Sequence, residues 1–440
     1  MQAAAGAVLL GLFAVLALLE VPIAFSLGLS ALLTILIFMP GQGLDILASQ
    51  VRGSLLHEPL MAIPLFIAAG LAFSKSGVAS RLVRLARLAM GGLPGGLAIV
   101  VVVVSVFFAA MSGSGPAAVA ALGALLIPVL AENNYSREFA SALMAASGGL
   151  GIIIPPSIAM VIYGLLAADQ MQEGILHLFV AGVLPGLVVG AALIGYVAWA
   201  SWRRGYGTRV ERVGGRELAR AFVAALPGLI APVVILVCIY RGLSSPTRVA
   251  AVAVVYALVV DLIFYRDVGL KDLWEVFRES AVISSQVLVI VASASLFAWV
   301  LDDRGITTSV VVWLSRAPVA PWLMLLLINA MLLAAGCFID AISIYYIFVP
   351  ILLPVVKQIG VSPLHFGVIM VVNLAIGQAT PPVGVNLFVA CGISKLSLER
   401  VSRAVVPFVL AEIAALLVIT YCPFLSEALP RLLPSVGGAP

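Results

Sequence analysis

The chain has 440 residues, of which 63% are hydrophobic and only 10% are charged. Soluble domains carry about 25% charged residues, so this composition excludes a soluble globular protein and indicates an integral membrane protein. The formal net charge of +4 is modest. We attribute it to cytoplasmic loops, since no basic face interleaved with aromatic residues suggests nucleic-acid binding.

Apolar segments long enough to span a membrane, about 20 residues each, run nearly from end to end. In chain order they cover 3–19, 21–39, 58–75, 93–131, 138–167, 174–201, 221–240, 249–264, 281–301, 320–356, 365–392 and 404–425. Segments 93–131 and 320–356 are long enough to enter the membrane and return. No basic region precedes the first segment, so we expect no cleaved signal peptide.

Basic residues in the links predict the orientation of the chain. Links 75–87, 203–220 and 395–403 are rich in arginine and lysine, and we expect them to be cytoplasmic. With three spans before the first of these links, the N-terminus lies outside. All three links fall inside only if the two double-length segments each enter and leave on one side. The charge pattern therefore favours two re-entrant hairpins, although a pair of ordinary spans keeps the same parity.

Residues 266–279 combine apolar residues at helical spacing with charges on the opposite face. This pattern is typical of an interfacial helix on the cytoplasmic surface. An amphipathic link packed on the protein has the same pattern, and both interpretations stay open here.

Two halves of the sequence align without gaps at an offset of 226 residues. The stretch that begins at Leu126 matches the stretch that begins at Leu352, including a Pro-Pro pair in each. The predicted topology makes the two units opposite in orientation. Inverted repeats with interrupted hydrophobic segments at matching places indicate a secondary transporter.

Each unit contains two breaks, at 111–117 and 148–157 in the first and at 335–341 and 376–386 in the second. The offset places Ser112 opposite Phe338, Ser114 opposite Asp340 and Ile154 opposite Thr380. A Pro-Pro pair removes two backbone donors, so we expect the carbonyls of Gly151 and Ile154, and of Gly377 and Thr380, to lack intrahelical partners. Such carbonyls, with the hydroxyls of Ser112, Ser114 and Thr380, suit Na⁺. A proline kink with serines bonded to the backbone is the structural alternative.

Asp340 is the one carboxylate well inside a double-length apolar segment, and an intramembrane carboxylate suggests function. A purely structural role, capping the helix that follows, is equally compatible. Asp261 is expected to reach the interface, and Asn386 is a candidate for a substrate carboxylate. The three histidines are far apart in the sequence, so we expect no transition-metal site. The four cysteines lack CxxC spacing and are interpreted as small buried hydrophobes.

At these breaks the sequence resembles the large membrane (M) subunit of tripartite ATP-independent periplasmic (TRAP) transporters, the DctM-like family. The resemblance rests on FFAAMSGSGPAAVAALG (107–123), GGLGIIIPPSIAMVIYG (148–164), FVPILLPV (348–355) and NLAIGQATPPVGVNLFVA (373–390). It implies an all-α polytopic transporter of the elevator type, with two hairpins and two broken helices in the moving part.

The resemblance also implies a division of the chain. We expect scaffold helices over 1–57, a first repeat unit over 58–201 with hairpin 93–131 and broken helix 138–167, central scaffold helices and the interfacial helix over 202–280, a second unit over 281–425 with hairpin 320–356 and broken helix 365–392, and a tail over 426–440.

The family's two Na⁺ sites lie beside the hairpin tips and the Pro-Pro breaks. Carried over, the first uses Ser112, Ser114, Gly151, Ile154 and Pro155, and the second uses Gly336, Cys337, Gly377, Thr380 and Val383. Asp340 and Asn386 are assigned to substrate binding or tip support. Na⁺ is the expected coupling ion, with no organic cofactor.

The resemblance implies Na⁺-driven uptake of an organic acid, a carboxylate such as a C4-dicarboxylate or a sialic-acid-like sugar acid, at the bacterial or archaeal inner membrane. A periplasmic binding protein would deliver the acid, and a separate four-helix membrane subunit would widen the scaffold. A stand-alone Na⁺- or H⁺-coupled dicarboxylate symporter of related architecture is the alternative. An intramembrane hydrolase that uses Ser114 or Asp340 is disfavoured, because neither a GxSG element with a helical histidine nor a second aspartate of suitable context is present; we therefore expect no enzyme.

Overall fold

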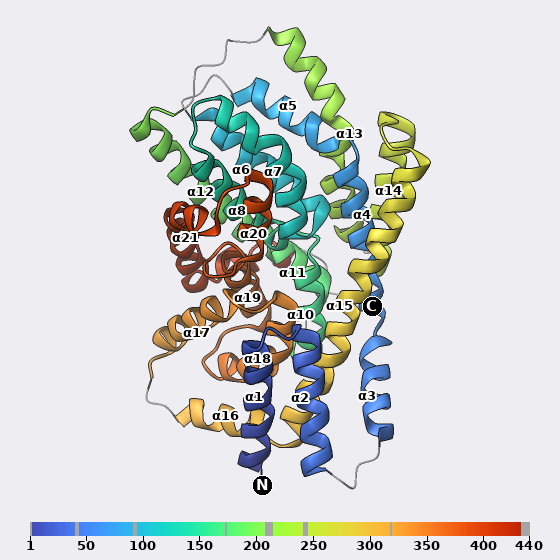
Figure 1. Ribbon diagram of the computed structural model, residues 1–440, viewed down its shortest axis with the longest axis vertical. Coiled ribbons are helices and arrows are strands. Elements are labelled where there is room, and N and C mark those ends of the chain that lie inside the picture. Colours follow the sequence, from blue (N-terminus) through green and yellow to red (C-terminus); the bar gives the residue numbers. More distant parts are fainter. Residues whose placement is uncertain are drawn as a thin grey trace.

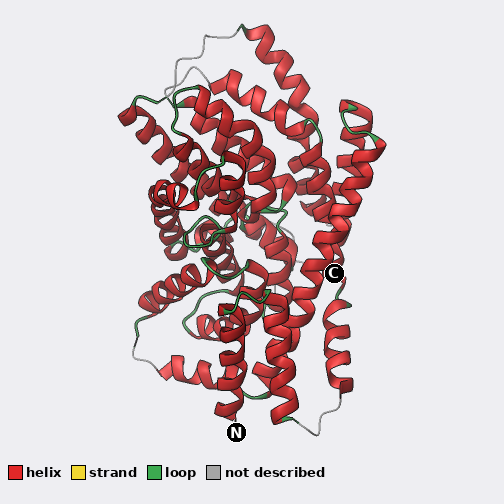
Figure 2. Ribbon diagram, in the orientation of Figure 1, coloured by secondary structure: helices red, strands yellow, loops and turns green. Residues whose placement is uncertain are grey.

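The computed structural model describes residues 2–39, 44–90, 95–171, 174–206, 214–240, 245–316 and 319–432, and within those ranges every regular element is a helix (Figure 2). Eight of the described helices are long and apolar enough to cross a membrane, or nine if a pair bent by 44° at residues 154–157 counts as one span. The expected all-helical membrane protein is confirmed.

The N-terminal part and the first repeat unit contain thirteen elements. They are α1 (Gln2–Leu18), α2 (Ile23–Phe38), α3 (Leu44–Leu55), η1 (Glu58–Met61), α4 (Ala62–Lys75), α5 (Val78–Met90), α6 (Gly96–Ser112), α7 (Gly115–Glu132), α8 (Arg137–Gly148), α9 (Leu150–Ile153), α10 (Ile158–Leu166), α11 (Ile175–Ala181) and α12 (Val183–Arg204).

The central part and the second unit follow. They contain α13 (Gly215–Tyr240), α14 (Pro246–Val259), η2 (Val260–Tyr265), α15 (Leu270–Asp303), α16 (Ile306–Arg316), α17 (Pro321–Gly336), α18 (Ala341–Gln358), α19 (Pro363–Gly377), α20 (Val385–Ser394), α21 (Leu398–Tyr421), α22 (Phe424–Glu427) and η3 (Pro430–Leu432).

The helix boundaries of the two units match at the same offset as their sequences. Helices α7 and α18 begin and end at positions 226 residues apart. The same offset relates Ser136 and Ser362, whose hydroxyls accept hydrogen bonds from the backbone N–H of Phe139 and His365, both at 3.2 Å. A serine at the N-cap position satisfies one of the free N–H groups at a helix start. The same local chemistry therefore starts the broken helix in both units.

Both double-length segments fold as helical hairpins, α6–α7 and α17–α18. Figure 1 shows α6 and α7 in the upper half of the molecule and α17 and α18 in the lower half, with α19 near the middle. The two hairpins thus approach the middle of the molecule from opposite ends, as an inverted repeat requires.

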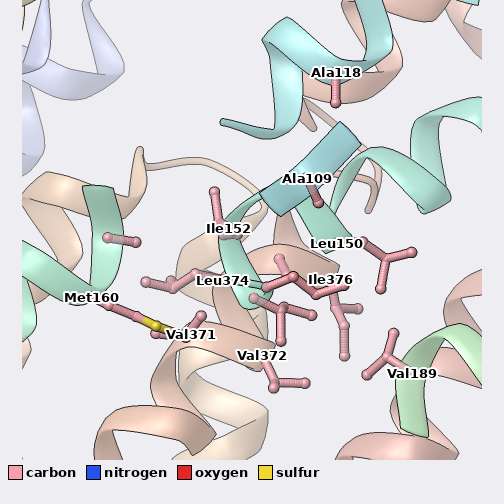
Figure 3. Packing of buried hydrophobic residues seen from close by; sticks show 14 of the residues in the cluster. Ala109, Ala118, Leu150, Ile152, Met160, Val189, Val371, Val372, Leu374 and Ile376 are labelled. Carbon is pink, nitrogen blue, oxygen red and sulfur yellow. The ribbon is translucent and has the colours of Figure 1, made fainter. Parts of the chain in front are cut away.

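The central crossing of α9 and α19 is packed with aliphatic side chains. Leu150 and Ile152 of α9 lie near Leu374 and Ile376 of α19 in Figure 3, and all four are at most 5% exposed. Every residue of α19 from Leu364 to Gly377 is buried, so this helix lies in the protein core and not at a lipid-facing surface.

The three basic links lie at one end of the molecule. Arg84 of the first link pairs with Glu217 of the second at 3.6 Å. The second and third links both contact the start of α8, through Tyr206 with Ser136 at 3.5 Å and Arg400 with Glu138 at 3.8 Å. This grouping agrees with the charge-based topology. Residues 207–213 of the second link, residue 173 and the end of the tail, 433–440, lie outside the described residues.

Two link predictions differ from the structure. The expected interfacial helix over 266–279 is not separate, because α15 runs unbroken from Leu270 to Asp303 and includes the span expected at 281–301. Its first turns carry exposed Leu270 and Trp274. Lys75 pairs with Glu275 at 2.9 Å and with Glu279 at 3.1 Å, so this stretch is also anchored on the protein.

The link expected at 75–87 is largely helical, as α5. Its apolar face, which includes Val78, Leu82 and Val83, is buried, while Arg84 on the other face is exposed. A short amphipathic helix was overlooked because its arginines were counted only as topology signals. The same offset of 226 places α16 opposite α5, so this helix belongs to the repeat.

Candidate transport site

The first hairpin turns within two residues. Helix α6 ends at Ser112, and Gly113 follows in the left-handed region with φ of +60°. Glycine adopts this conformation without steric cost, which makes it the usual residue after a helix end. Ser114 then precedes α7, whose second residue is Pro116. Proline is favoured in the first helical turn because the N–H that it lacks would be unbonded there.

The tip of the first hairpin rests on the first Pro-Pro break. A β-carbon placed on Gly151 would lie 2.7 Å from the carbonyl oxygen of Ser114, and one placed on Gly113 would lie 2.8 Å from that of Pro156. Only glycine permits these backbone approaches. The structure therefore brings Ser114 and Gly151 together, as the sequence predicts.

The other residues of the first predicted ion site are Ser112, Ile154 and Pro155. Ser112 is 3% exposed, and its hydroxyl donates to the carbonyl of Ser114 at 3.4 Å. Pro155 is buried in the break. The side chain of Ile154 points to α12, since a β-carbon on Gly186 would lie 2.6 Å from its Cγ1. The carbonyl that faces the tip is that of Pro156, a residue that the prediction did not include.

The second hairpin turns over Cys337–Asp340, and Asp340 caps α18. Its Oδ1 accepts hydrogen bonds from the backbone N–H of Ile342 and Ser343, both at 3.0 Å, and its Oδ2 accepts one from the Ser343 hydroxyl at 2.6 Å. The capping role considered in the sequence analysis is therefore present. The carboxylate also lines the cavity described below, so the two roles coexist.

The tip of the second hairpin rests on the second Pro-Pro break. A β-carbon on Gly377 would lie 2.8 Å from the Cα atom of Gly336, so the two backbones are in direct contact. Cys337, the next residue, is 9% exposed. The structure therefore brings Gly336 and Gly377 of the predicted second site together.

One expectation about this break is wrong. The carbonyl of Gly377 accepts a hydrogen bond from the Thr380 N–H at 3.1 Å, because the helix tightens to an i→i+3 turn before Pro381. The Thr380 hydroxyl donates to the Ile376 carbonyl at 2.7 Å, which leaves its lone pairs for a cation. Val383 is half-buried.

Asn386 crosses from the second unit to the first. It is fully buried, and its Nδ2 donates to the carbonyl of Ala145 in α8 at 3.2 Å. A β-carbon on Gly115 would lie 3.0 Å from its Oδ1. Asn386 is absent from the cavity lining, so of its two predicted roles the structure favours tip support over substrate binding.

A cavity of about 400 Å³ lies where the tips, the breaks and two long helices meet. The hairpin tips contribute residues 112–117 and 336–342, except Cys337 and Phe338. The breaks contribute Ile152, Ile158, Ala159, Gln378 and Val385, and α4 and α15 contribute Ile67, Gly70, Leu71, Ile283, Gln286, Val287 and Ile290. Its volume is within the range of small-molecule sites.

Three of these lining residues were not recognised in the sequence. Gln286 is an isolated amide within an apolar span, and Gln378 directly follows Gly377 in the break; both are signals that were available. Gly70 was not recognisable, because its role depends on a contact. A β-carbon there would lie 2.8 Å from the carbonyl oxygen of Ser112, so α4 touches the first tip.

The charge of the cavity is unusual for an anion site. Among the described residues, its lining contains no lysine, arginine or histidine, and Asp340 is the only carboxylate there. The first turn of α7 borders the cavity, and a helix N-terminus attracts anions. Within the described part of the chain no three histidine, cysteine or acidic side chains are grouped to hold a metal.

Two acidic residues lie buried away from the cavity. Asp261 is 2% exposed, so the expectation that it reaches the interface is wrong; its side chain is buried within the protein. Glu412 in α21 is 1% exposed and was not among the predicted site residues.

Comparisons with known proteins agree with this architecture. A family model described as "Tripartite ATP-independent periplasmic transporter, DctM component" matches residues 10–425. The chain is 38% identical over 440 residues to the C4-dicarboxylate TRAP transporter large permease protein DctM of Rhodobacter capsulatus, covering 97% of this chain and 99% of that protein. It is 31% identical over 416 residues to the sialic acid TRAP transporter large permease protein SiaM of Vibrio cholerae, covering 94% and 96%.

The chain is also 40% identical over 416 residues to the isethionate TRAP transporter permease protein DctMQ of Oleidesulfovibrio alaskensis, which covers 94% of this chain and only 65% of that longer protein. Among solved structures, the YdaH transporter of Alcanivorax borkumensis has a TM-score of 0.67 at 14% identity, covering 90% of this chain and 91% of that one. MtrF of Neisseria gonorrhoeae has a TM-score of 0.60 at 15% identity, covering 90% and 86%. At these identities the two structures show a shared fold alone.

Proposed function

Because the chain belongs to the DctM family, the large permease subunits of TRAP transporters, we propose that it carries an organic acid inward across the bacterial or archaeal inner membrane in symport with Na⁺. The observation that carries the proposal is the pair of tip–break contacts, Ser114 with Gly151 and Gly336 with Gly377. Each contact brings unwound backbone beside a Pro-Pro break, where carbonyl oxygens are available to a hard cation.

The cavity between these contacts is the proposed substrate site. An organic acid needs compensation for its negative charge when it leaves water, and the lining supplies no basic side chain. The N-terminus of α7 and a cation at the adjacent break supply it instead. Substrate binding then depends on the coupling ion, which is the physical requirement for symport.

The proposed movement is of the elevator type. Hairpins α6–α7 and α17–α18, with the broken helices α8–α10 and α19–α20, form the moving part. Helices α4 and α15 border the cavity from the other side and belong to the scaffold. Because the cavity lies between the two parts, sliding one past the other exposes it to each side of the membrane in turn.

The proposed partners follow from the family. A periplasmic binding protein delivers the acid, and a small four-helix membrane subunit packs on the scaffold. The relative named DctMQ is longer than this chain, and the match covers only 65% of it, which leaves room for a second membrane subunit in the same polypeptide. The N-terminus is proposed to lie outside, at the end opposite the basic links. A stand-alone symporter remains the second candidate, and uptake by the large subunit alone would identify it.

The test of Na⁺ binding is thermal unfolding of the purified complex of the two membrane subunits in NaCl, LiCl, KCl and choline chloride. A ligand that binds only the folded state stabilises it by about 2.7 kcal/mol at roughly 100 times its dissociation constant. We expect a Na⁺-selective rise in unfolding temperature that Thr380→Ala weakens. The matched control is Thr34→Ala, because the Thr34 hydroxyl makes the same bond four residues back in α2, to the Ser30 carbonyl at 2.7 Å.

Equal stabilisation by K⁺ and Na⁺, or the same loss in both threonine variants, would contradict a Na⁺ site at the second break. Uptake into proteoliposomes completes the test. Transport that continues without a Na⁺ gradient would exclude the proposed coupling.

A further inference from the structure

We infer that the cavity selects acids with a single anionic end and an apolar body, rather than dicarboxylates or polyhydroxylated sugar acids. This inference rests on the proposed function, since it assigns the substrate class of the same site. The evidence is the distribution of polar and apolar groups around the cavity.

Large aliphatic side chains line much of the cavity. Ten of its 23 lining residues are isoleucine, leucine or valine: Ile67, Leu71, Ile152, Ile158, Ile283, Val287, Ile290, Ile339, Ile342 and Val385. They come from both long helices, both breaks and the second tip. A carboxylate or a hydroxyl placed against such a wall loses its water without gaining a hydrogen bond, which costs several kcal/mol for a charge and about 1–3 kcal/mol for a neutral group.

The polar groups gather at the first tip and the second break. Ser112, Ser114 and Gln378 line the cavity there, beside the N-terminus of α7. This region offers one place for an anionic group.

The rest of the lining offers no comparable site for a second anionic group. The remaining charged group, Asp340, is negative, and both of its oxygens already accept hydrogen bonds at the start of α18. On the scaffold side the one polar lining residue is Gln286, a neutral amide. A dianion would therefore hold its second carboxylate against aliphatic side chains or beside a like charge, and both arrangements are unfavourable.

The relatives named above include proteins described for C4-dicarboxylates and for sialic acid. Both compounds are more polar than this wall accommodates. The inferred substrate class therefore differs from theirs although the fold is shared.

The experiment compares three acids of equal chain length on the purified two-subunit complex in NaCl. Hexanoate has one charge and an apolar body, adipate has two charges, and gluconate has one charge and a chain of hydroxyls. Apparent affinities are taken from the concentration dependence of the unfolding temperature, with choline chloride as the ion control. We expect hexanoate to bind at least tenfold more tightly than adipate or gluconate, and only in NaCl.

A charge on the wall should change this order. Ile290→Arg places a cation on the aliphatic side of the cavity, and we expect it to reduce the preference for hexanoate over adipate by at least tenfold. Ile290→Gln is the matched control, because it adds polarity and similar length without charge and should leave adipate disfavoured.

The outcomes separate the two levels of the proposal. If adipate or gluconate binds wild type as tightly as hexanoate, the inferred substrate class is wrong and carboxylate transport stands. If no acid raises the unfolding temperature in NaCl while Na⁺ alone does, both the substrate class and the assignment of the cavity as the substrate site are overturned. If Ile290→Arg leaves the order unchanged, the aliphatic wall does not select the substrate.

Discussion

Single glycines decide how closely the hairpin tips approach the broken helices. At Gly151 and Gly377 the nearest atoms to an added β-carbon belong to backbone, at 2.7 and 2.8 Å. Backbone cannot rotate away as a side chain can, so even one methyl group has to push the tip from the break. The ion sites proposed there depend on that approach.

Gly151→Ala should therefore lower stability by about 1–3 kcal/mol, the usual cost of overpacking, and should abolish the Na⁺-dependent rise in unfolding temperature. Gly195→Ala in α12 is the control. A β-carbon there meets nothing within 4 Å, so this change should be neutral or stabilise by up to about 1 kcal/mol. Retention of the full Na⁺ effect in Gly151→Ala would show that the first tip–break contact does not form an ion site.

The two roles of Asp340 can be separated at the same scale. Asparagine caps a helix about as well as aspartate does, whereas alanine costs about 0.5–2 kcal/mol. Asp340→Asn should therefore unfold close to the wild-type temperature, and Asp340→Ala should unfold earlier. If Asp340→Asn is as unstable as Asp340→Ala, the negative charge rather than the cap stabilises the tip.

At the scale of elements, a buried polar network joins the second hairpin to its neighbours. Asn373 in α19 donates to Asn329 in α17 at 2.8 Å, and Asn329 donates to Thr420 in α21 at 3.0 Å. All three side chains are at most 2% exposed. The network ties three helices together where apolar packing alone would allow sliding.

A double-mutant cycle between Asn329→Ala and Thr420→Val measures this link. Interhelical hydrogen bonds in membrane proteins contribute about 0.6 kcal/mol on average and at most about 1.7 kcal/mol, and we expect a coupling energy in this range from unfolding measurements. Strict additivity of the two changes would mean that the hydrogen bond contributes nothing and that packing holds α17 in place.

At the scale of the whole molecule, the elevator proposal requires that the first tip leave α4 during transport. Gly70 of α4 and Ser112 of the tip are in contact. A cysteine at Gly70 would itself push the tip away, so the cysteines are placed at Leu71 of α4 and Ala117 of the tip, which both line the cavity. In a chain whose four native cysteines are replaced, joining them with a bifunctional thiol reagent that contains a cleavable disulfide should stop uptake. Reduction should restore the uptake of the same sample, which controls for damage by the substitutions. Undiminished transport by the cross-linked protein would exclude movement of the tip past α4.

Much of the architecture was predictable because it depends on local patterns. Long apolar segments, interrupted at SGSG and at the Pro-Pro pairs, predict hairpins and broken helices, and the offset of 226 residues predicts their repetition. The continuous α15 was not predicted, because charged residues near a helix start look like a surface link. The helical link α5 was overlooked for a similar reason.

The sequence by itself determined the membrane class, the inverted repeat, the two tips and the two breaks, because each follows from the composition of one contiguous stretch. Only the tertiary structure decided which backbone groups meet, such as Gly70 with Ser112, and that Asn386 supports a tip instead of lining the cavity. It alone also decided that ten large aliphatic side chains line the cavity, and that none of the lining residues in the described part of the chain is basic. These features depend on segments far apart in the chain, and no local pattern specifies which side chains such segments bring together.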